Sequence, residues 1–565
     1  MNSLVLLVIG LAMFTAGYLI YSKFLGRKIF QLDPAFSTPA HEMTDGVDYV
    51  PTNKYVLWGH HFTSVAGAAP IVGPAIAVIW GWLPAFLWVT IGTVFFAGMH
   101  DAGALWASVR NRGQSMGMLS GRYIGARGRN LFLVVIFLLL LMVNAAFAVV
   151  IKNLLISTPT SVIPVWGAIV VAVIVGQMIY RWRMNLALTT IIGVTALYTL
   201  IVIGDSNPIE LPESTLGMAP GTAWIVLLFA YAFLASLLPV WVLLQPRDYI
   251  NGVQLFIGLG ILYGATLLEA PKLVVPAFND NVPDGTPGLV PLLFVTIACG
   301  AISGFHGMVS SGTSAKQLDA EPDVRFVGYF GAVGEGLLAL GTIIVTTSGF
   351  ATLADWEKVY TEFGAGGVGA FVQGGGSIVN AGLGIPTSLS ATILATMAVL
   401  FAATTMDTGV RLQRFVVHEI AEVLGTSISK IAATTVAVLV GLGLTFSQGS
   451  SGEGGMRIWP LFGTTNQLLA SLTLAIITVM LLRKRRNPWP ALIPLALVFV
   501  MSFYAALVQL RDLYDAKDWL LLGIDAIIIV AALWVAFEAV IAMQKARTEP
   551  AEAEDADLIS ARSGQ

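Results

Sequence analysis

The pattern of hydrophobic and polar positions divides the chain into long apolar runs separated by short polar connections. A helix needs about 20 apolar residues to cross the hydrocarbon core of a bilayer. Counted in this way, the pattern predicts about fifteen membrane-spanning helices. They lie near residues 3–22, 63–80, 83–108, 131–151, 163–180, 185–203, 222–243, 252–270, 289–312, 326–350, 388–408, 429–446, 461–482, 489–509 and 519–543. We therefore expect an all-α polytopic membrane protein.

The composition is typical of a membrane protein and argues against nucleic acid as a partner. Hydrophobic residues make up 56% of the 565 residues and charged residues 11%, whereas soluble domains carry roughly 25% charged residues. The net charge of -3 gives no basic field that would attract nucleic acid. The single cysteine, Cys299, excludes a disulfide framework, and its apolar surroundings predict a buried, inert thiol. The apolar run at the N-terminus lacks a cleavage site and is interpreted as the first membrane helix.

The distribution of basic residues predicts the orientation of the helices. If the N-terminus lies outside, 24 of the 30 lysines and arginines fall on the inside, which satisfies the positive-inside rule for an odd number of helices. The expected topology is N-out and C-in. The polar, acidic tail from Lys545 is predicted to be disordered and cytoplasmic.

The segment Trp58–Ala77 (WGHHFTSVAGAAPIVGPAIA) contains polar side chains followed by closely spaced glycine and proline. Proline removes backbone donors and glycine permits unusual dihedral angles, so we expect a helix broken near mid-membrane. Backbone groups freed at such a break can hold an anionic substrate and a coupling cation. The candidate substrate-binding residues here are His61, Ser64, Gly67, Ala68 and Gly73. The alternative is a tightly packed helix kinked by proline.

A second segment, Ala298–Lys316 (ACGAISGFHGMVSSGTSAK), has the same character but runs in the opposite direction. Its candidates are Ser303, Gly304, Phe305, His306 and Ser310. Two broken helices of opposite direction predict an inverted repeat of five plus five helices. The expected organisation is a first helix and cytoplasmic loop (1–57), a first repeat (58–204), two inserted helices (205–288), a second repeat (289–482), two C-terminal helices (483–544) and the tail (545–565).

Acidic residues within the apolar runs are candidates for ion coupling. Asp101 follows His100, and a buried carboxylate beside an imidazole can relay a proton. Thr404, Thr405 and Asp407 offer oxygen ligands for a cation such as Na⁺. The alternative is that both acids pair with cytoplasmic arginines, since Arg411 lies one helical turn after Asp407.

Other chemistry lacks support in the sequence. The histidines are not spaced as metal ligands, because adjacent His60 and His61 point about 100° apart on a helix. Nucleotide-binding and hydrolase motifs are missing. We therefore expect no metal, no cofactor and no enzymatic activity. The amphipathic stretch Arg411–Leu424 is interpreted as an interfacial helix. Residues 351–387 are predicted to form two short helices over an entrance, with a floppy connector as the alternative.

Four strings in the chain together resemble the carbon starvation protein A family. They are GHHFTSVAGAAPIVGPAIA, QPRDYINGVQL, ACGAISGFHGMVSSGTSAKQ and FGTTNQLLA, spread from residue 59 to about 470. The resemblance implies a bacterial inner-membrane transporter that is induced in carbon shortage and takes up peptides and pyruvate. It also implies the five-plus-five inverted repeat of the amino acid–polyamine–organocation superfamily, the LeuT-like fold. It assigns no binding residue, so the candidates above rest on the residues themselves.

The expected function is secondary active import of a small carboxylate, pyruvate, and/or short peptides by cation symport. His100 and Asp101 would handle the proton, which is favoured over Na⁺ as the coupling ion. The expected partners are the small-molecule substrate and the lipid bilayer. One alternative is sodium-coupled transport of an amino-acid-like substrate. The other is a gated channel, against which the bulk of Phe62 and Phe305 beside the two breaks argues.

Overall fold

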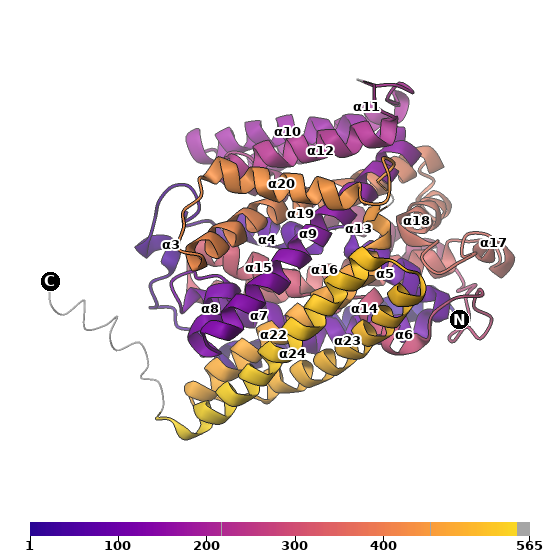
Figure 1. The fold of residues 1–565 in the computed structure, drawn as a ribbon. Helices are drawn as coiled ribbons and strands as arrows, with labels where there is room; N and C mark the ends of the chain where they lie inside the picture. Colours follow the sequence, from indigo (N-terminus) through magenta and orange to yellow (C-terminus); the bar gives the residue numbers. More distant parts are fainter. Residues whose placement is uncertain (216, 453, 551–565) are drawn as a thin grey trace.

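The fold is a single bundle of helices, most of which cross it in roughly the same direction (Figure 1). A computed structural model describes residues 1–215, 217–452 and 454–550. Within these residues the chain forms helices and isolated β-bridges but no strand. The all-α fold expected from the apolar runs is therefore confirmed.

Twelve helices among the described residues are long and apolar enough to cross a membrane. They are α1 with its continuation (Ser3–Ile29), α6–α7 (Trp82–Val109), α9 (Ala126–Ser157), α10 with its continuation (Pro159–Arg181), α11 (Leu186–Ser206), α12 (Pro220–Leu237), α13 (Leu244–Glu269), α16 with its N-terminal turns (Glu321–Ser348), α19 (Thr387–Val423), α22 (Trp459–Arg483), α23 (Trp489–Asp515) and α24 (Trp519–Thr548). The shorter apolar helix α20 (Lys430–Thr445) packs among them.

The first predicted break is present. Helix α4 (Lys54–Ala66) ends at Gly67, and α5 (Ala69–Ala77) begins two residues later at an angle of 43°. Gly67 has φ +54° and ψ -155°, a conformation that favours glycine. Pro70 follows in the first turn of α5, where its missing N–H costs nothing. The expected break is thus confirmed, and the two pieces together are long enough to form one further span.

The second predicted break is also present. Helix α14 (Leu289–Thr296) and helix α15 (Gly304–Gly312) are joined by the non-helical residues 297–303, which include Gly300 at φ +97°. The two breaks touch, because a Cβ on Gly300 would lie 3.6 Å from Pro70 Cα. The total of about fifteen spans and the N-out orientation remain predictions.

Residues 351–387 form short helices, as expected. Helix α17 (Leu353–Glu357) is followed by α18 (Gly367–Leu383), which packs against α5, α13, α16 and α19. Tyr360 between them donates a hydrogen bond to Ala75 O at 2.8 Å. The segment is therefore anchored to the bundle. It lies at the end opposite α3 (Pro39–Glu42) and α8 (Met116–Tyr123) (Figure 1).

Two expectations about helix ends are wrong. The stretch 411–424 is not a separate interfacial helix, because α19 continues unbroken to Val423 and its Arg411 and Arg414 are buried. Both arginines find partners inside the bundle, Arg411 with Asp48 at 2.9 Å and Arg414 with Ser236 O at 2.6 Å. The predicted disordered tail begins too early, since α24 remains helical to Thr548. Residues 551–565 of that tail lie outside the described residues.

Candidate functional site

Four buried ionisable side chains form a continuous line across three helices. We call His100, Asp101, His306 and Glu335 the histidine–carboxylate chain. Asp101 on α7 (Gly98–Val109) accepts from His100 Nδ1 at 2.7 Å and from His306 Nδ1 at 2.8 Å. His306 Nε2 lies 3.2 Å from Glu335 Oε2 on α16. Each of the four is at most 1% exposed, so a proton held here is shielded from bulk water.

The start of α15 positions His306 in this chain. A Cβ on Gly304 would lie 2.4 Å from Asn466 O of α22, so only glycine permits this approach. The Asn466 Oδ1 atom accepts from Phe305 N at 2.8 Å and from Ser303 Oγ at 3.2 Å. The N-terminus of α15, expected to bind substrate, is therefore partly capped by the protein itself.

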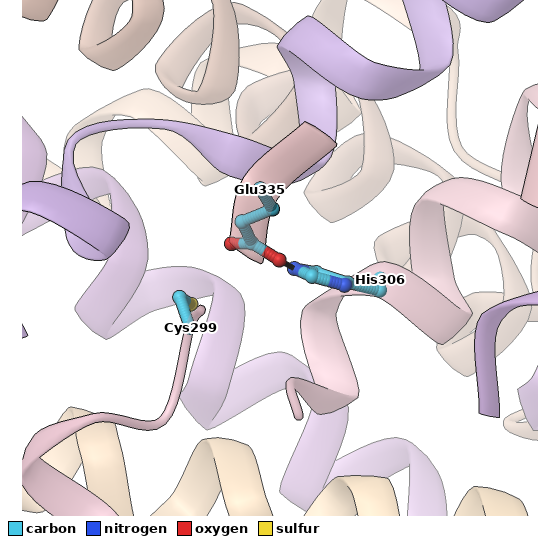
Figure 2. A group of neighbouring side chains, drawn as sticks. All are labelled: Cys299, His306 and Glu335. Atoms are coloured by element: carbon cyan, nitrogen blue, oxygen red, sulfur yellow. Dashed lines mark ion pairs between the residues drawn. The ribbon is translucent and has the colours of Figure 1, made fainter. Parts of the chain in front are cut away.

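Cys299, His306 and Glu335 bring three different donor atoms together. Figure 2 shows His306 and Glu335 pointing toward one another, with Cys299 beside them on the link before α15. The three donor atoms lie within 4.8 Å of one another, and their types are those that hold transition metals. Sequence reasoning rejected a metal site from histidine spacing and missed this set, because its members are distant in the chain.

Neighbouring side chains contact all three residues, whereas His306 Nε2 and Glu335 Oε1 make no hydrogen bond with the described residues. His306 contacts Asp101 and Glu335, as described. Asn466 Nδ2 donates to Cys299 Sγ at 3.3 Å, and the thiol lies 3.4 Å from Ser303 Oγ. Cys299 is buried in the hydrophobic core, as expected, and it also contacts the polar side chains of Asn466 and Ser303.

A second buried group surrounds an arginine of α13. We call Arg247, Asp248, Asp407, His60 and Tyr231 the arginine cluster. Arg247 Nη1 donates to Asp407 and to Tyr231 Oη at 2.5 Å, and Nη2 lies 2.8 Å from Asp248 Oδ1. His60 Nδ1 lies 2.7 Å from Asp248 Oδ2. Arg247 and Asp248 lie on α13, and His60, Tyr231 and Asp407 come from α4, α12 and α19.

The arginine cluster corrects the pairing considered from the sequence. Asp407 pairs with Arg247 and not with Arg411, which contacts Asp48 instead. Asp101 pairs with histidines and not with an arginine. Sequence separation alone favoured the nearest basic residue on the same helix, whereas helix packing supplies partners from other helices.

The candidate cation residues lie against the first broken helix. Thr405 Oγ1 donates to Ser64 O at 3.1 Å, near the end of α4. The Ser64 hydroxyl lies 3.2 Å from Thr408 Oγ1 and 3.4 Å from Asp248 Oδ2. Thr404 Oγ1 donates within α19 to Leu400 O at 2.8 Å. The structure therefore joins this group to the candidate substrate residue Ser64.

Some of the remaining candidate residues serve packing at the first break, and others carry a polar atom that makes no hydrogen bond with the described residues. A Cβ on Gly67 would lie 2.6 Å from Thr405 Oγ1, and one on Gly73 would lie 2.4 Å from Thr296 O, so both glycines permit close packing. The Ala68 carbonyl accepts from Ile71 N at 3.0 Å at the start of α5. These three residues shape the break rather than present side chains to a ligand.

His61 and Ser310 each keep a polar atom without a partner. His61 Nδ1 lies 2.8 Å from Ser314 Oγ, whereas His60 contacts Asp248, so the adjacent histidines serve different partners as expected. His61 Nε2 and Ser310 Oγ are buried and make no hydrogen bond with the described residues. Buried polar atoms normally have partners, which makes these two available to a bound molecule.

Two cavities lie on either side of the α14–α15 link. The α14 cavity has a volume of about 110 Å³ and is lined by Thr296, Ile76 of α5 and Trp459 of α22. The α15 cavity has a volume of about 290 Å³ and is lined by residues of α8, α9, α15 and α19, including Met308 and Ser311. The histidine–carboxylate chain lines neither of these cavities.

Comparison with known sequences gives matches along most of the chain. The family described as Carbon starvation protein CstA matches residues 2–358 and 350–505. The chain is 32% identical to a protein of Campylobacter jejuni named Peptide transporter CstA, over 90% of this chain and 80% of that protein. It is 29% identical to a protein of Escherichia coli named Pyruvate/proton symporter BtsT, over 89% and 81% of the two chains.

Comparison with solved structures gives matches by fold. A manganese transporter of Eremococcus coleocola superposes with a TM-score of 0.52 and 12% identity, over 89% of this chain and 99% of that one. A mutant of the same transporter gives a TM-score of 0.53 with 11% identity. At this identity the likeness concerns the arrangement of helices alone.

Proposed function

The chain belongs to the carbon starvation protein CstA family, and we propose that it imports pyruvate and/or short peptides by proton symport during carbon limitation. It is a multi-pass protein of the bacterial inner membrane, and a transporter rather than an enzyme. The substrate and the coupling ion are the parts of this account that are proposed.

The observation that carries the proposal is the histidine–carboxylate chain. Four buried ionisable groups lie within hydrogen-bond or ion-pair distance of one another, and no lysine or arginine among the described residues pairs with them. An imidazole between two carboxylates can accept a proton from one and pass it to the other. Because the chain joins α7, α15 and α16, a change in its proton count alters contacts between a broken helix and its neighbours.

The arginine cluster supports a proton over Na⁺ as the coupling ion. Asp407 is the only carboxylate among the candidate cation ligands Thr404, Thr405 and Asp407. Arg247 pairs with this carboxylate and with Asp248, so its guanidinium already places a positive charge beside Asp407. A second cation at the same position would be repelled by the guanidinium in a medium of low dielectric constant.

The substrate carboxylate is proposed to bind where the two breaks touch. The start of α5 lies at this contact, and a helix N-terminus favours negative charge, although Pro70 has no N–H and the N–H groups of Ile71 and Val72 already bond to Ala68 O. His61 Nε2 and Ser310 Oγ supply unpaired polar atoms on the two broken helices. The start of α15 contributes less than expected, because Asn466 already caps it.

Helix packing supports an inverted repeat. Helix α13 packs against α4 as α22 packs against α15, and α12 packs against α9 as α20 packs against α19. This correspondence pairs α4–α5, α6–α7, α9, α12 and α13 with α14–α15, α16, α19, α20 and α22. In this arrangement the inserted helices are α10 and α11, rather than the two helices expected within 205–288.

The proposed orientation places the N-terminus outside and α24 ending inside. The end that carries α3 and α8 then faces the cytoplasm, as the basic loops predict. The α15 cavity opens toward the cytoplasm in this orientation, and the α14 cavity lies on the outer side of the link. Alternating access would open one cavity to the central site while the other stays closed.

Uptake by purified protein in proteoliposomes tests the proposed function. Labelled pyruvate and labelled dialanine are supplied outside, with an inward proton gradient, an inward sodium gradient or neither. We expect saturable accumulation of at least one substrate under the proton gradient alone. Accumulation driven only by sodium would overturn proton coupling, and non-saturating flux that ignores both gradients would indicate a channel.

A further inference from the structure

The α15 cavity carries two opposite charges that do not pair with each other. Lys316 lies just after α15, and Glu419 lies on the last turns of α19. Both residues line this cavity of about 290 Å³. No ion pair joins them to each other within the described residues, and neither belongs to the histidine–carboxylate chain or the arginine cluster.

Lys316 is held by aromatic rings rather than by a carboxylate. Its Nζ atom lies 4.5 Å from the centre of the Phe415 ring and 5.5 Å from that of Tyr49. Cation–π contacts offset part of the cost of removing an ammonium from water. They leave its three N–H donors without a charged acceptor among the described residues, so a carboxylate that enters the cavity finds a ready partner.

Glu419 is only half satisfied. Its Oε1 atom accepts a hydrogen bond from Ser115 Oγ at 2.6 Å, which fixes the orientation of the carboxylate. Its Oε2 atom is buried and makes no hydrogen bond with the described residues. An unpaired buried carboxylate oxygen is costly, and a ligand ammonium would satisfy it.

The rest of the wall suits a small organic molecule. Met308, Leu412 and Phe415 present apolar surface, and Ser311 and Gln114 add polar groups. The volume approaches the roughly 300 Å³ at the lower end of small-molecule sites. The cavity therefore offers an anion acceptor, a cation acceptor and an apolar surface between α8, α9, α15 and α19.

We propose that the α15 cavity is a second binding site, for a zwitterion whose carboxylate contacts Lys316 and whose ammonium contacts Glu419. This inference rests on the proposed function, because a substrate leaving the central site passes α15 on its way to the cytoplasm. A short peptide or an amino acid satisfies both charges, whereas pyruvate satisfies Lys316 alone. The site therefore binds a substrate that carries an ammonium group more tightly than one that lacks it.

Equilibrium binding to purified protein in nanodiscs tests this site. Labelled dialanine is the probe, and the competitors are N-acetyl-dialanine, dialanine amide and pyruvate. Glu419→Gln should weaken dialanine binding by on the order of tenfold, the effect of losing one charge-assisted hydrogen bond, and leave N-acetyl-dialanine unchanged. Lys316→Met should weaken the binding of dialanine and of N-acetyl-dialanine and leave the binding of dialanine amide unchanged.

Matched controls separate the site from folding. Glu422→Gln removes an exposed carboxylate three residues from Glu419, and Lys28→Met removes an exposed ammonium; both should bind like the wild type. Glu419→Asp and Lys316→Arg keep the charges and should retain most of the affinity. Each variant must also elute as a single species in size-exclusion chromatography.

The outcomes distinguish this inference from the proposed function. If Glu419→Gln weakens dialanine and N-acetyl-dialanine equally, or neither, the zwitterion site is overturned even when proton-driven uptake stands. If the wild type binds pyruvate but no dialanine, the site is likewise overturned. If the variants discriminate as expected but uptake ignores the proton gradient, the site stands and proton coupling fails.

Discussion

The buried guanidinium of Arg247 contacts three polar side chains. Its guanidinium contacts Asp248 on its own helix, Asp407 on α19 and the Tyr231 hydroxyl on α12. Removing one member of a buried ion pair leaves the other charge without compensation. The arginine cluster is therefore a point where α12, α13 and α19 depend on one side chain.

Arg247→Met should destabilise the protein by about 3–5 kcal/mol, because two carboxylates lose their counter-charge. The measurement is the midpoint of thermal unfolding in detergent. Adding Asp407→Asn should recover part of the loss, since it removes one uncompensated charge. Arg511→Met, at a side chain that is 85% exposed, is the control and should leave the midpoint unchanged. An equal midpoint for Arg247→Met and wild type would contradict this account.

Lys316 should confer a pH dependence on binding in the α15 cavity. Burial lowers the pKa of the Lys316 ammonium, so it loses its proton at lower pH than an ordinary lysine. Asp48 and Glu419 nearby act in the opposite direction, whereas Arg411 and Arg414 act with burial. Burial also raises the pKa of Tyr49, so its hydroxyl loses the proton at higher pH than an ordinary tyrosine.

Affinity for N-acetyl-dialanine, which has no ammonium of its own to titrate, should therefore fall as pH rises from 7 to 10, with a midpoint below the value of about 10.4 for free lysine. Lys316→Arg should abolish this fall, because arginine stays protonated throughout. Binding curves measured across that range for both proteins check the prediction. Parallel profiles for wild type and Lys316→Arg would assign the titration to another group.

Single residues were predictable where a polar group interrupts an apolar run. Asp101 and His306 were both proposed from the sequence, but their contact across 205 positions follows from packing. Glu335 also stands alone in an apolar stretch, GAVGEGLLAL, and could have been found by the same signal. Lys316 and Glu419 could not, because charged residues at helix ends look like ordinary cytoplasmic surface.

At the scale of elements, the two breaks distinguish α4–α5 and α14–α15 from the continuous helices around them. Glycine with proline predicted the first interruption, and glycine among polar side chains predicted the second, since the effect of these residues on the backbone is local. The second break lies at 297–303, ahead of Gly304, and not around it. Gly304 instead serves a close contact with α22, which no local pattern reveals.

Gly304→Ala should abolish uptake or prevent folding. The added methyl would lie 2.4 Å from Asn466 O and 2.6 Å from Ala470 N, so α15 and α22 must separate. Gly264→Ala on α13, where no heavy atom lies within 4 Å, is the matched control and should transport normally. Proteoliposome uptake and monodispersity of both variants provide the check; normal uptake by Gly304→Ala would show that the contact is dispensable.

At the scale of the whole molecule, the positions of the helices along the chain could be predicted from the sequence, whereas their packing partners could not. Apolar runs locate the spans because the bilayer sets their length. Helices that are apolar on every side give little sign of their neighbours, so the packing of α13 against α4, or of α12 against α9, could not be anticipated. For the same reason, the proximity of Cys299, His306 and Glu335 in space could not be predicted from the sequence.

Metal removal should leave transport intact. His306 and Glu335 contact each other, and Asn466 donates to Cys299, so the set is held without an ion. Protein stripped with a strong chelator and reconstituted should accumulate substrate at the untreated rate. Loss of uptake that Zn²⁺ restores would instead make these three residues a functional metal site.

The central claim, that the histidine–carboxylate chain couples transport to protons, is tested most directly by Asp101→Asn in two assays on the same proteoliposomes. The first measures accumulation of labelled pyruvate or dialanine under an inward proton gradient. The second measures exchange of labelled for unlabelled substrate without any gradient. We predict that Asp101→Asn loses accumulation and retains exchange, because the binding site survives without its proton. Accumulation at the wild-type level by Asp101→Asn would contradict the account.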